Sequence, residues 1–164
     1  MKLDRRTLIG GGAMAVLGLY IGAVRAAEGG PRPKAPFQLT DAEWRKRLSP
    51  QAYAVLRRAA TEHAFTSPLD KEKRKGLFAC AGCGQTLFDS RTKFNSGTGW
   101  PSFYRPLAKA IGTSVDRDLG MSRTEVHCAR CGGHLGHVFE DGPPPTGLRY
   151  CMNGVALKFE PAPA

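Results

Sequence analysis

Two Cys-x-x-Cys units constrain the fold of this chain more than any other feature of its sequence. Cys80 and Cys83 form the first unit, and Cys128 and Cys131 form the second. Together they offer four thiolates to one tetrahedral metal ion, and sulfur ligands favour zinc or iron. The same spacing is also compatible with two structural disulfides or with one redox-active pair. We expect a structural four-cysteine zinc site, with one ion per chain.

The segment between the two units indicates how such a site is used. Residues 84–127 separate them, far more than the ~15–20 residues of a compact zinc ribbon. The ion would therefore join two distant hairpins instead of building an autonomous finger. Gly84 and Gly132 each follow a second cysteine, which suits a turn that directs amides at a metal-bound sulfur.

The remaining pattern predicts a helical N-terminal arm before an all-β core, in a chain whose 164 residues suit one domain. Thr40 to Glu43 has the capping-box pattern and opens a helix through Leu48. Ser49 and Pro50 start a second helix that runs to about Thr61. Residues 67–75 are expected to form a charged loop. From Leu77 onward, short β-branched and aromatic runs alternate with turn residues, which indicates short antiparallel strands.

The first 26 residues have the pattern of an export signal. Arg5 and Arg6 precede an uncharged run, and a small-residue cleavage pattern ends at Ala26. The arginine pair resembles a twin-arginine signal, which predicts export to the periplasm. The signal segment would then contact the membrane only transiently. If the segment is not cleaved, it would act as a membrane anchor. Residues 27–39 are expected to be a flexible linker.

Cys151 has no partner in the Cys-x-x-Cys pattern. In a strand, Arg149, Cys151 and Asn153 would share one face. A guanidinium beside a thiol lowers its pKa, and the thiolate is the nucleophile. A buried, inert cysteine is the alternative interpretation.

His134 and His137 follow the second Cys-x-x-Cys unit, and Asp141 comes shortly after. A regular strand would send two histidines three residues apart to opposite faces, but a bulge at Gly136 would bring both inward. A second metal site and ordinary core histidines are also compatible with the pair.

The run GTGWPSF raises a separate question, because Gly97 and Gly99 bracket Thr98 and are followed by Trp100 and Pro101. The glycines suit backbone conformations or close approaches that other residues resist. Proline stiffens the exit and presents the indole from a fixed frame.

Together, GTGWPSF, the two Cys-x-x-Cys units, CGGHLGHVF, DGPPPTGLRYC and MNGVAL resemble the B-type peptide-methionine (R)-S-oxide reductases over residues 40–160. The resemblance implies a mainly β fold of two antiparallel sheets in a sandwich-like or barrel-like core, with short N-terminal helices and a structural zinc. It implies repair of oxidised proteins by reduction of methionine-R-sulfoxide.

The same resemblance implies roles for individual residues. Cys151 would attack the sulfoxide sulfur and become a sulfenic acid. His134, His137 and Asn153 would surround the sulfoxide oxygen, with the histidines as proton donors. The remaining implied contacts are with the substrate: Trp100 would hold its methyl group, and Arg149, Asp141 and Phe103 would shape its site.

Thr98 departs from the pattern of this family, many of whose members carry a resolving cysteine at that position. A threonine hydroxyl cannot form the intramolecular disulfide. The resemblance therefore implies that an external thiol, either a thioredoxin-like protein or a small thiol, regenerates Cys151.

Two other function classes fit parts of the sequence. A net charge of +10 suits a nucleic-acid module, but the aromatic residues cluster with glycine and proline turns instead of alternating with basic residues. No nucleic-acid partner is therefore expected. A thiol–disulfide exchanger would use one Cys-x-x-Cys unit, and protection of all four thiols by a metal would exclude it.

Overall fold

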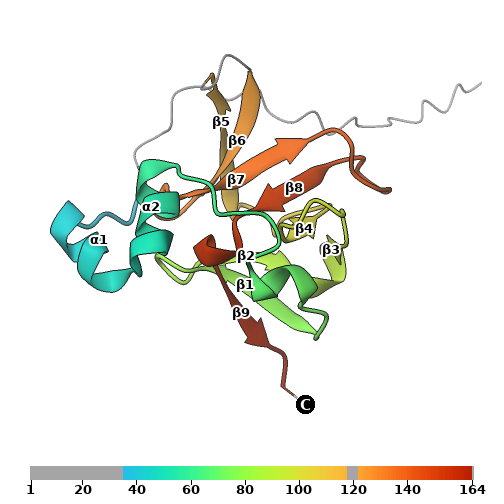
Figure 1. Cartoon of the computed structure of the whole chain (residues 1–164), viewed down its shortest axis with the longest axis horizontal. Helices are drawn as coiled ribbons and strands as arrows, with labels where there is room; N and C mark the ends of the chain where they lie inside the picture. The colour runs from blue at the N-terminus through green and yellow to red at the C-terminus, as the bar shows by residue number, and fades with distance from the viewer. Residues whose placement is uncertain (1–34, 118–121, 164) are drawn as a thin grey trace, which may run out of the picture.

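The computed structural model describes residues 35–117 and 122–163 (Figure 1). The predicted signal peptide and residues 27–34 of the predicted linker lie outside the described residues. Within them, two short helices precede nine strands that form two antiparallel sheets. The expectation of a mainly β fold with short N-terminal helices is confirmed. None of the helices in this part of the chain has the length and apolar character needed to cross a membrane.

The two helices begin where their capping residues predict. Helix α1 (Asp41–Arg47) starts with a complete capping box between Thr40 and Glu43. Helix α2 (Pro50–Arg58) is capped by the Ser49 side chain and ends at Ala59, which has a left-handed φ of 54°. The second helix is therefore shorter than predicted. The chain must turn there because Glu62, just beyond, bonds to residues near the C-terminus.

The sheets differ in size, and both are built by antiparallel pairing. The smaller sheet has the strand order β2-β1-β9, and the larger has the order β3-β4-β8-β7-β6-β5. The strands are β1 (Gly76–Cys80), β2 (Thr86–Asp89), β3 (Lys93–Phe94), β4 (Ser102–Phe103), β5 (Ile111–Asp116), β6 (Arg123–Cys128), β7 (His134–Phe139), β8 (Arg149–Met152) and β9 (Leu157–Pro161). Short 3-10 turns are η1 (Pro68–Lys71), η2 (Ser90–Thr92) and η4 (Gly154–Ala156). The predicted loop at 67–75 thus contains one helical turn.

A cluster of aromatic rings joins the two sheets. Phe103 of β4 is fully buried and stacks on Phe88 of β2, with ring centroids 4.3 Å apart. Its other face meets Phe78 of β1 edge-on at 4.9 Å. Such pairs add to the stabilisation from apolar burial. Phe103 was expected to shape the substrate site, but its ring lies in the core because both sheets pack against it.

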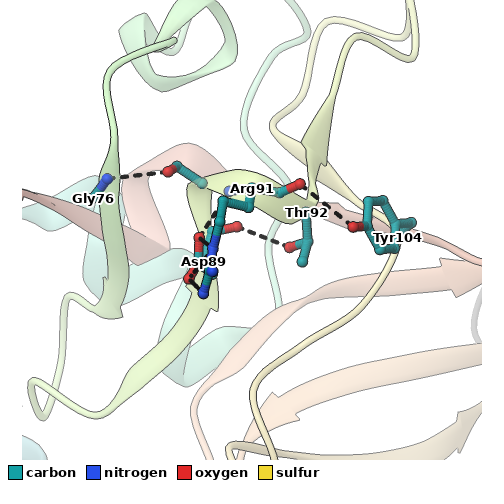
Figure 2. A network of polar contacts seen from close by, with 6 residues as sticks. Gly76, Asp89, Arg91, Thr92 and Tyr104 are labelled. Carbon is teal, nitrogen blue, oxygen red and sulfur yellow. Dashed lines mark hydrogen bonds and ion pairs between the residues drawn. The ribbon is translucent and has the colours of Figure 1, made fainter.

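The chain passes from the smaller to the larger sheet through the network in Figure 2. Asp89 accepts a hydrogen bond from the Arg91 amide at 2.8 Å, and its carboxylate also pairs with the Arg91 guanidinium. The Thr92 hydroxyl donates to the Asp89 carbonyl, and the Tyr104 hydroxyl donates to the Arg91 carbonyl. Gly76 of β1 is held to the same turn by its amide. These bonds set where β3 and β4 begin, and therefore where the GTGWPSF run lies.

Residues 35–39 differ from the flexible linker that composition predicts. The Phe37 amide donates to the Arg130 carbonyl at 2.9 Å, and the Arg130 guanidinium lies over the Phe37 ring. The same ring meets Trp44 edge-on at 5.9 Å. Apolar contacts therefore order the end of this segment against the second Cys-x-x-Cys unit.

Candidate active site and metal centre

The two Cys-x-x-Cys units meet at the end of the smaller sheet, as their spacing predicted. The sulfur atoms of Cys80 and Cys131 are 3.7 Å apart, and those of Cys83 and Cys128 are 3.6 Å apart. All four sulfur atoms lie within 4.8 Å of one another, and all four residues are buried. A tetrahedral ion with Zn–S bonds of about 2.3 Å requires sulfur separations of about 3.8 Å, so the cluster can hold a metal ion.

None of the four cysteines is in a disulfide in this structure, since bonded sulfur atoms lie about 2.05 Å apart. The glycines after the units have left-handed φ angles of 75° at Gly84 and 66° at Gly132. Their amides donate to the carbonyls of Cys80 and Cys128. Hydrogen bonds from neighbouring thiols, foremost Cys128, lower the pKa of Cys83, and the Gln85 backbone adds to them.

Three guanidinium groups surround the cysteine cluster. Arg47 donates to the Gly82 carbonyl at 2.5 Å, Arg57 donates to the Cys131 carbonyl at 3.1 Å, and Arg130 donates to the Cys83 carbonyl at 3.1 Å. Four thiolates around a divalent ion carry a net negative charge. Cations beside these carbonyls therefore complement the loaded site electrostatically.

Cys151 lies apart from this cluster, on β8, directly opposite His137 on β7. Side chains paired in this way point to the same face, with Cβ atoms ~4.5–5.5 Å apart. Both line a cavity of about 140 Å³. The other residues that line it are Thr61, Trp100, Arg123, Gly136, Phe139 and Asn153.

A bulge in β7 brings the two histidines together, as predicted. Gly136 pairs with Val126 but His134 pairs with His127, so Leu135 is an extra residue in the strand. The imidazole rings of His134 and His137 lie 5.4 Å apart, edge to face. A Cβ at position 136 would lie 2.1 Å from the Cys151 carbonyl oxygen, so β8 can approach only a glycine there.

Each histidine is held by a carboxylate that the sequence analysis did not single out. His134 Nδ1 lies 2.6 Å from Glu125, and both residues are buried. His137 Nε2 lies 2.7 Å from Asp116, which also pairs with Arg123 at 2.7 Å. No motif marks these partners, since Asp116 is the last residue of β5 and Glu125 lies in the mixed polar and apolar strand β6.

Burial shifts the pKa values of Cys151 and His137, the paired residues that both line the cavity. Burial raises the pKa of Cys151, although the Thr98 hydroxyl, the Arg149 charge and the Ser102 hydroxyl act in the opposite direction. Burial also lowers the pKa of His137, although its hydrogen bond to Asp116 opposes this. The Arg149 guanidinium therefore lowers the pKa of Cys151 as expected, but burial raises it by more. The two pKa shifts favour a neutral thiol beside a neutral imidazole.

Thr98 faces the reactive sulfur. Its hydroxyl oxygen lies 3.8 Å from the Cys151 sulfur and 2.8 Å from the Ser96 hydroxyl. Ser96 in turn lies 2.8 Å from the fully buried Ser102 hydroxyl. A chain of three hydroxyl groups thus ends at Cys151.

The positions of Trp100 and Asn153 both depend on Glu62. The Trp100 indole N–H donates to the Glu62 carbonyl at 3.2 Å, and the Glu62 amide donates to Asn153 Oδ1 at 2.9 Å. Asn153 Nδ2 donates to the Leu135 carbonyl in the bulge. Pro101 is fully buried beside the indole, as expected of a residue that fixes its frame.

Neither Arg149 nor Asp141 lines the cavity, although Arg149 contacts Phe139, which does. The guanidinium lies 4.4 Å above the Phe139 ring and makes two hydrogen bonds to the Asp141 carboxylate, at 2.7 and 2.8 Å. The Arg149 side chain is 12% exposed and that of Asp141 is 61% exposed. Asp141 therefore orients the arginine from the surface.

A comparison with known protein families identifies the family to which this chain belongs. Residues 48–161 match the model of the SelR domain. The chain belongs to the SelR domain family. The matched residues include the four clustered cysteines and all the residues that line the Cys151 cavity.

Curated relatives of this SelR protein are proteins named peptide methionine sulfoxide reductase MsrB. That of Leptospira interrogans is 53% identical over 122 residues, which cover 74% of this chain and 93% of the relative. That of Bradyrhizobium diazoefficiens is 56% identical over 123 residues, covering 74% and 88%. That of Leifsonia xyli is 53% identical over 132 residues, covering 78% and 95%.

Proposed function

We propose that this SelR protein reduces methionine-R-sulfoxide in proteins and peptides through Cys151. Membership in a family whose relatives are peptide methionine sulfoxide reductases supports the reaction, and the chain is a methionine sulfoxide reductase of this family. The observation that carries the mechanism is Cys151, a free thiol outside the metal cluster that faces His137 across a small cavity.

The cavity supports a division of roles among its residues. The Trp100 indole offers an apolar face to the methyl group on the sulfoxide sulfur, and this contact sets which epimer points its sulfur at Cys151. His137 lies beside the thiol on the neighbouring strand and lines the same cavity, where it can reach the sulfoxide oxygen. Asn153 fixes the wall between them.

The reaction balances without an added proton. The Cys151 sulfur attacks the sulfoxide sulfur, and the oxygen then passes to the Cys151 sulfur as the bonds to the substrate sulfur break, so the thiol becomes a sulfenic acid and the sulfoxide leaves as a thioether. The thiol proton ends on that oxygen. Because the two pKa shifts favour a neutral pair, we propose that His137 takes the proton from Cys151 and gives it to the sulfoxide oxygen.

An external thiol would close the cycle. The Thr98 hydroxyl lies 3.8 Å from the Cys151 sulfur and has no sulfur to offer, and the other four cysteines form the buried cluster. A thiol of a thioredoxin-like protein or a small thiol would attack the sulfenic sulfur and release water. A second thiol would then reduce the mixed disulfide.

We also propose that zinc occupies the cysteine cluster and that residues 1–26 are a twin-arginine signal for export to the periplasm. Four buried thiolates at tetrahedral spacing suit zinc, which is redox-inert and stabilises the two hairpins without taking part in the reaction. Export of an already folded protein would allow the ion to be bound before the thiols meet an oxidising compartment.

The test compares the wild type with Cys151→Ser on peptides that contain either methionine-R-sulfoxide or methionine-S-sulfoxide, with a small dithiol as reductant. We expect turnover of the R epimer only, and its loss in Cys151→Ser with an unchanged metal content. Turnover by Cys151→Ser, or equal rates for both epimers, would contradict the proposal.

A further inference from the structure

Residues 61–66, which we term the rim segment, border the cavity and are held rigidly although they form no regular helix or strand. The Glu62 backbone bonds to both Asn153 and Trp100, as described above. The Glu62 carboxylate accepts hydrogen bonds from the amides of Gly154 and Val155. Thr61 itself lines the cavity. The rim segment is therefore fixed to three separate parts of the site.

A further contact holds the other end of the rim segment. The Phe65 amide donates to the Gly99 carbonyl at 2.8 Å. Phe65 has a φ of 65°, a left-handed conformation that a bulky residue rarely adopts. Such conformations persist only where the surrounding contacts impose them, and they concentrate at binding and catalytic sites.

This conformation exposes an aromatic ring to solvent. Phe65 is 69% exposed, the highest value among the large hydrophobic residues of the described part of the chain. The ring lies against Gly99, where an added Cβ would come within 2.7 Å of the Phe65 Cγ atom. Gly99 immediately precedes Trp100, so the exposed ring stands one residue from the cavity wall.

The cavity is too small to admit more than one side chain, so the rest of a polypeptide substrate must lie across its mouth. We propose that Phe65 is a docking residue that contacts an apolar side chain next to the oxidised methionine in an unfolded or flexible polypeptide. The proposal rests on the proposed function, and it adds a preference for apolar sequence around the methionine. Rigid attachment favours this role, because a fixed ring loses little freedom on binding.

The experiment measures kcat/KM on three R-sulfoxide substrates. They are N-acetyl-methionine sulfoxide amide, a short peptide with leucine on both sides of the sulfoxide, and the same peptide with serine on both sides. The main variant is Phe65→Asn, because asparagine tolerates a left-handed φ and keeps the backbone in place. Phe65→Tyr is the matched control that retains an aromatic ring.

We expect Phe65→Asn to lower kcat/KM for the leucine peptide by about tenfold, as is typical of a lost aromatic contact. The values for the serine peptide and the small amide should stay within about twofold, and Phe65→Tyr should resemble the wild type on all three. An equal loss on all substrates would show that Phe65 only supports the cavity and would overturn the proposal, as would no loss on the leucine peptide. A wild type that reduces none of the three would overturn the proposed function itself.

Discussion

Glu62 offers the sharpest test of how the site is assembled, because one side chain joins the rim segment to the turn after β8. Its carboxylate accepts hydrogen bonds from the amides of Gly154 and Val155 at the start of η4. Gly154 is buried, so its amide has no ready access to water once the carboxylate is removed. Glu62→Ala therefore breaks both bonds and leaves a buried donor without an acceptor.

The expected cost follows from these two bonds. A hydrogen bond to a charged group contributes ~1.5–3 kcal/mol, and Glu62 is partly exposed, so the lower value applies to each bond. The free energy of unfolding should fall by about 3 kcal/mol in Glu62→Ala. For a domain of this size, that corresponds to a melting temperature lower by roughly 10–15 °C. Glu62→Gln keeps one acceptor oxygen and should lose about half as much.

The assay is urea unfolding followed by circular dichroism, together with kcat/KM on a methionine-R-sulfoxide peptide. Glu140→Ala is the matched control, because Glu140 is an exposed glutamate on the same protein. Activity at 20 °C should also fall in Glu62→Ala, since the Glu62 backbone positions Trp100 and Asn153. A loss of unfolding free energy below about 0.5 kcal/mol, the usual range of a surface change, would refute the reasoning.

Three further predictions concern the thiols. In Thr98→Cys, oxidation by methionine sulfoxide without a reductant should produce an intramolecular disulfide with Cys151, which peptide mapping would detect. The reason is that the wild-type hydroxyl lies 3.8 Å from the Cys151 sulfur. Persistence of a sulfenic acid would contradict this prediction. Because burial raises the pKa of Cys151, the rate of its alkylation by iodoacetamide should still increase with pH above pH 8.5. Arg149→Met should shift this rate profile to higher pH. A rate that becomes constant below pH 8 would contradict the prediction. Removal of the metal by a chelator under reducing conditions should lower the melting temperature by about 10 °C or more, and zinc should restore it. An unchanged melting temperature after confirmed metal loss would show that the cluster does not hold the fold together.

The features that the sequence predicted well are those encoded in short local patterns. The capping box at Thr40 and the Ser49–Pro50 start placed both helices, because capping depends on neighbouring residues alone. The paired Cys-x-x-Cys units predicted the metal cluster for the same reason, since each unit is a local turn. The bulge at Gly136 was also predictable, because only a break in alternation lets both histidines face inward.

The features that the sequence did not predict depend on contacts between segments that are distant along the chain. The family resemblance implied that Phe103 shapes the substrate site, but the two sheets enclose its ring. Glu62 and Asp116 have no motif, and their roles follow only from partners at Asn153 and His137. The end of α2 was placed too late for the same reason, because a tertiary contact beyond it turns the chain.

For this protein, the sequence by itself determined the mainly β class and the four-cysteine cluster, because residue type and local spacing carry those properties. The role of Cys151 as the reactive thiol stays a prediction from the family resemblance. Only the tertiary structure decided the charge state of the site and the shape of its mouth. Burial, which no local pattern reports, outweighs the Arg149 charge at Cys151. The glycines around Thr98 also have a structural explanation: Gly97 and Gly99 have left-handed φ angles of 73° and 84°, and Gly99 leaves room for the Phe65 backbone and ring.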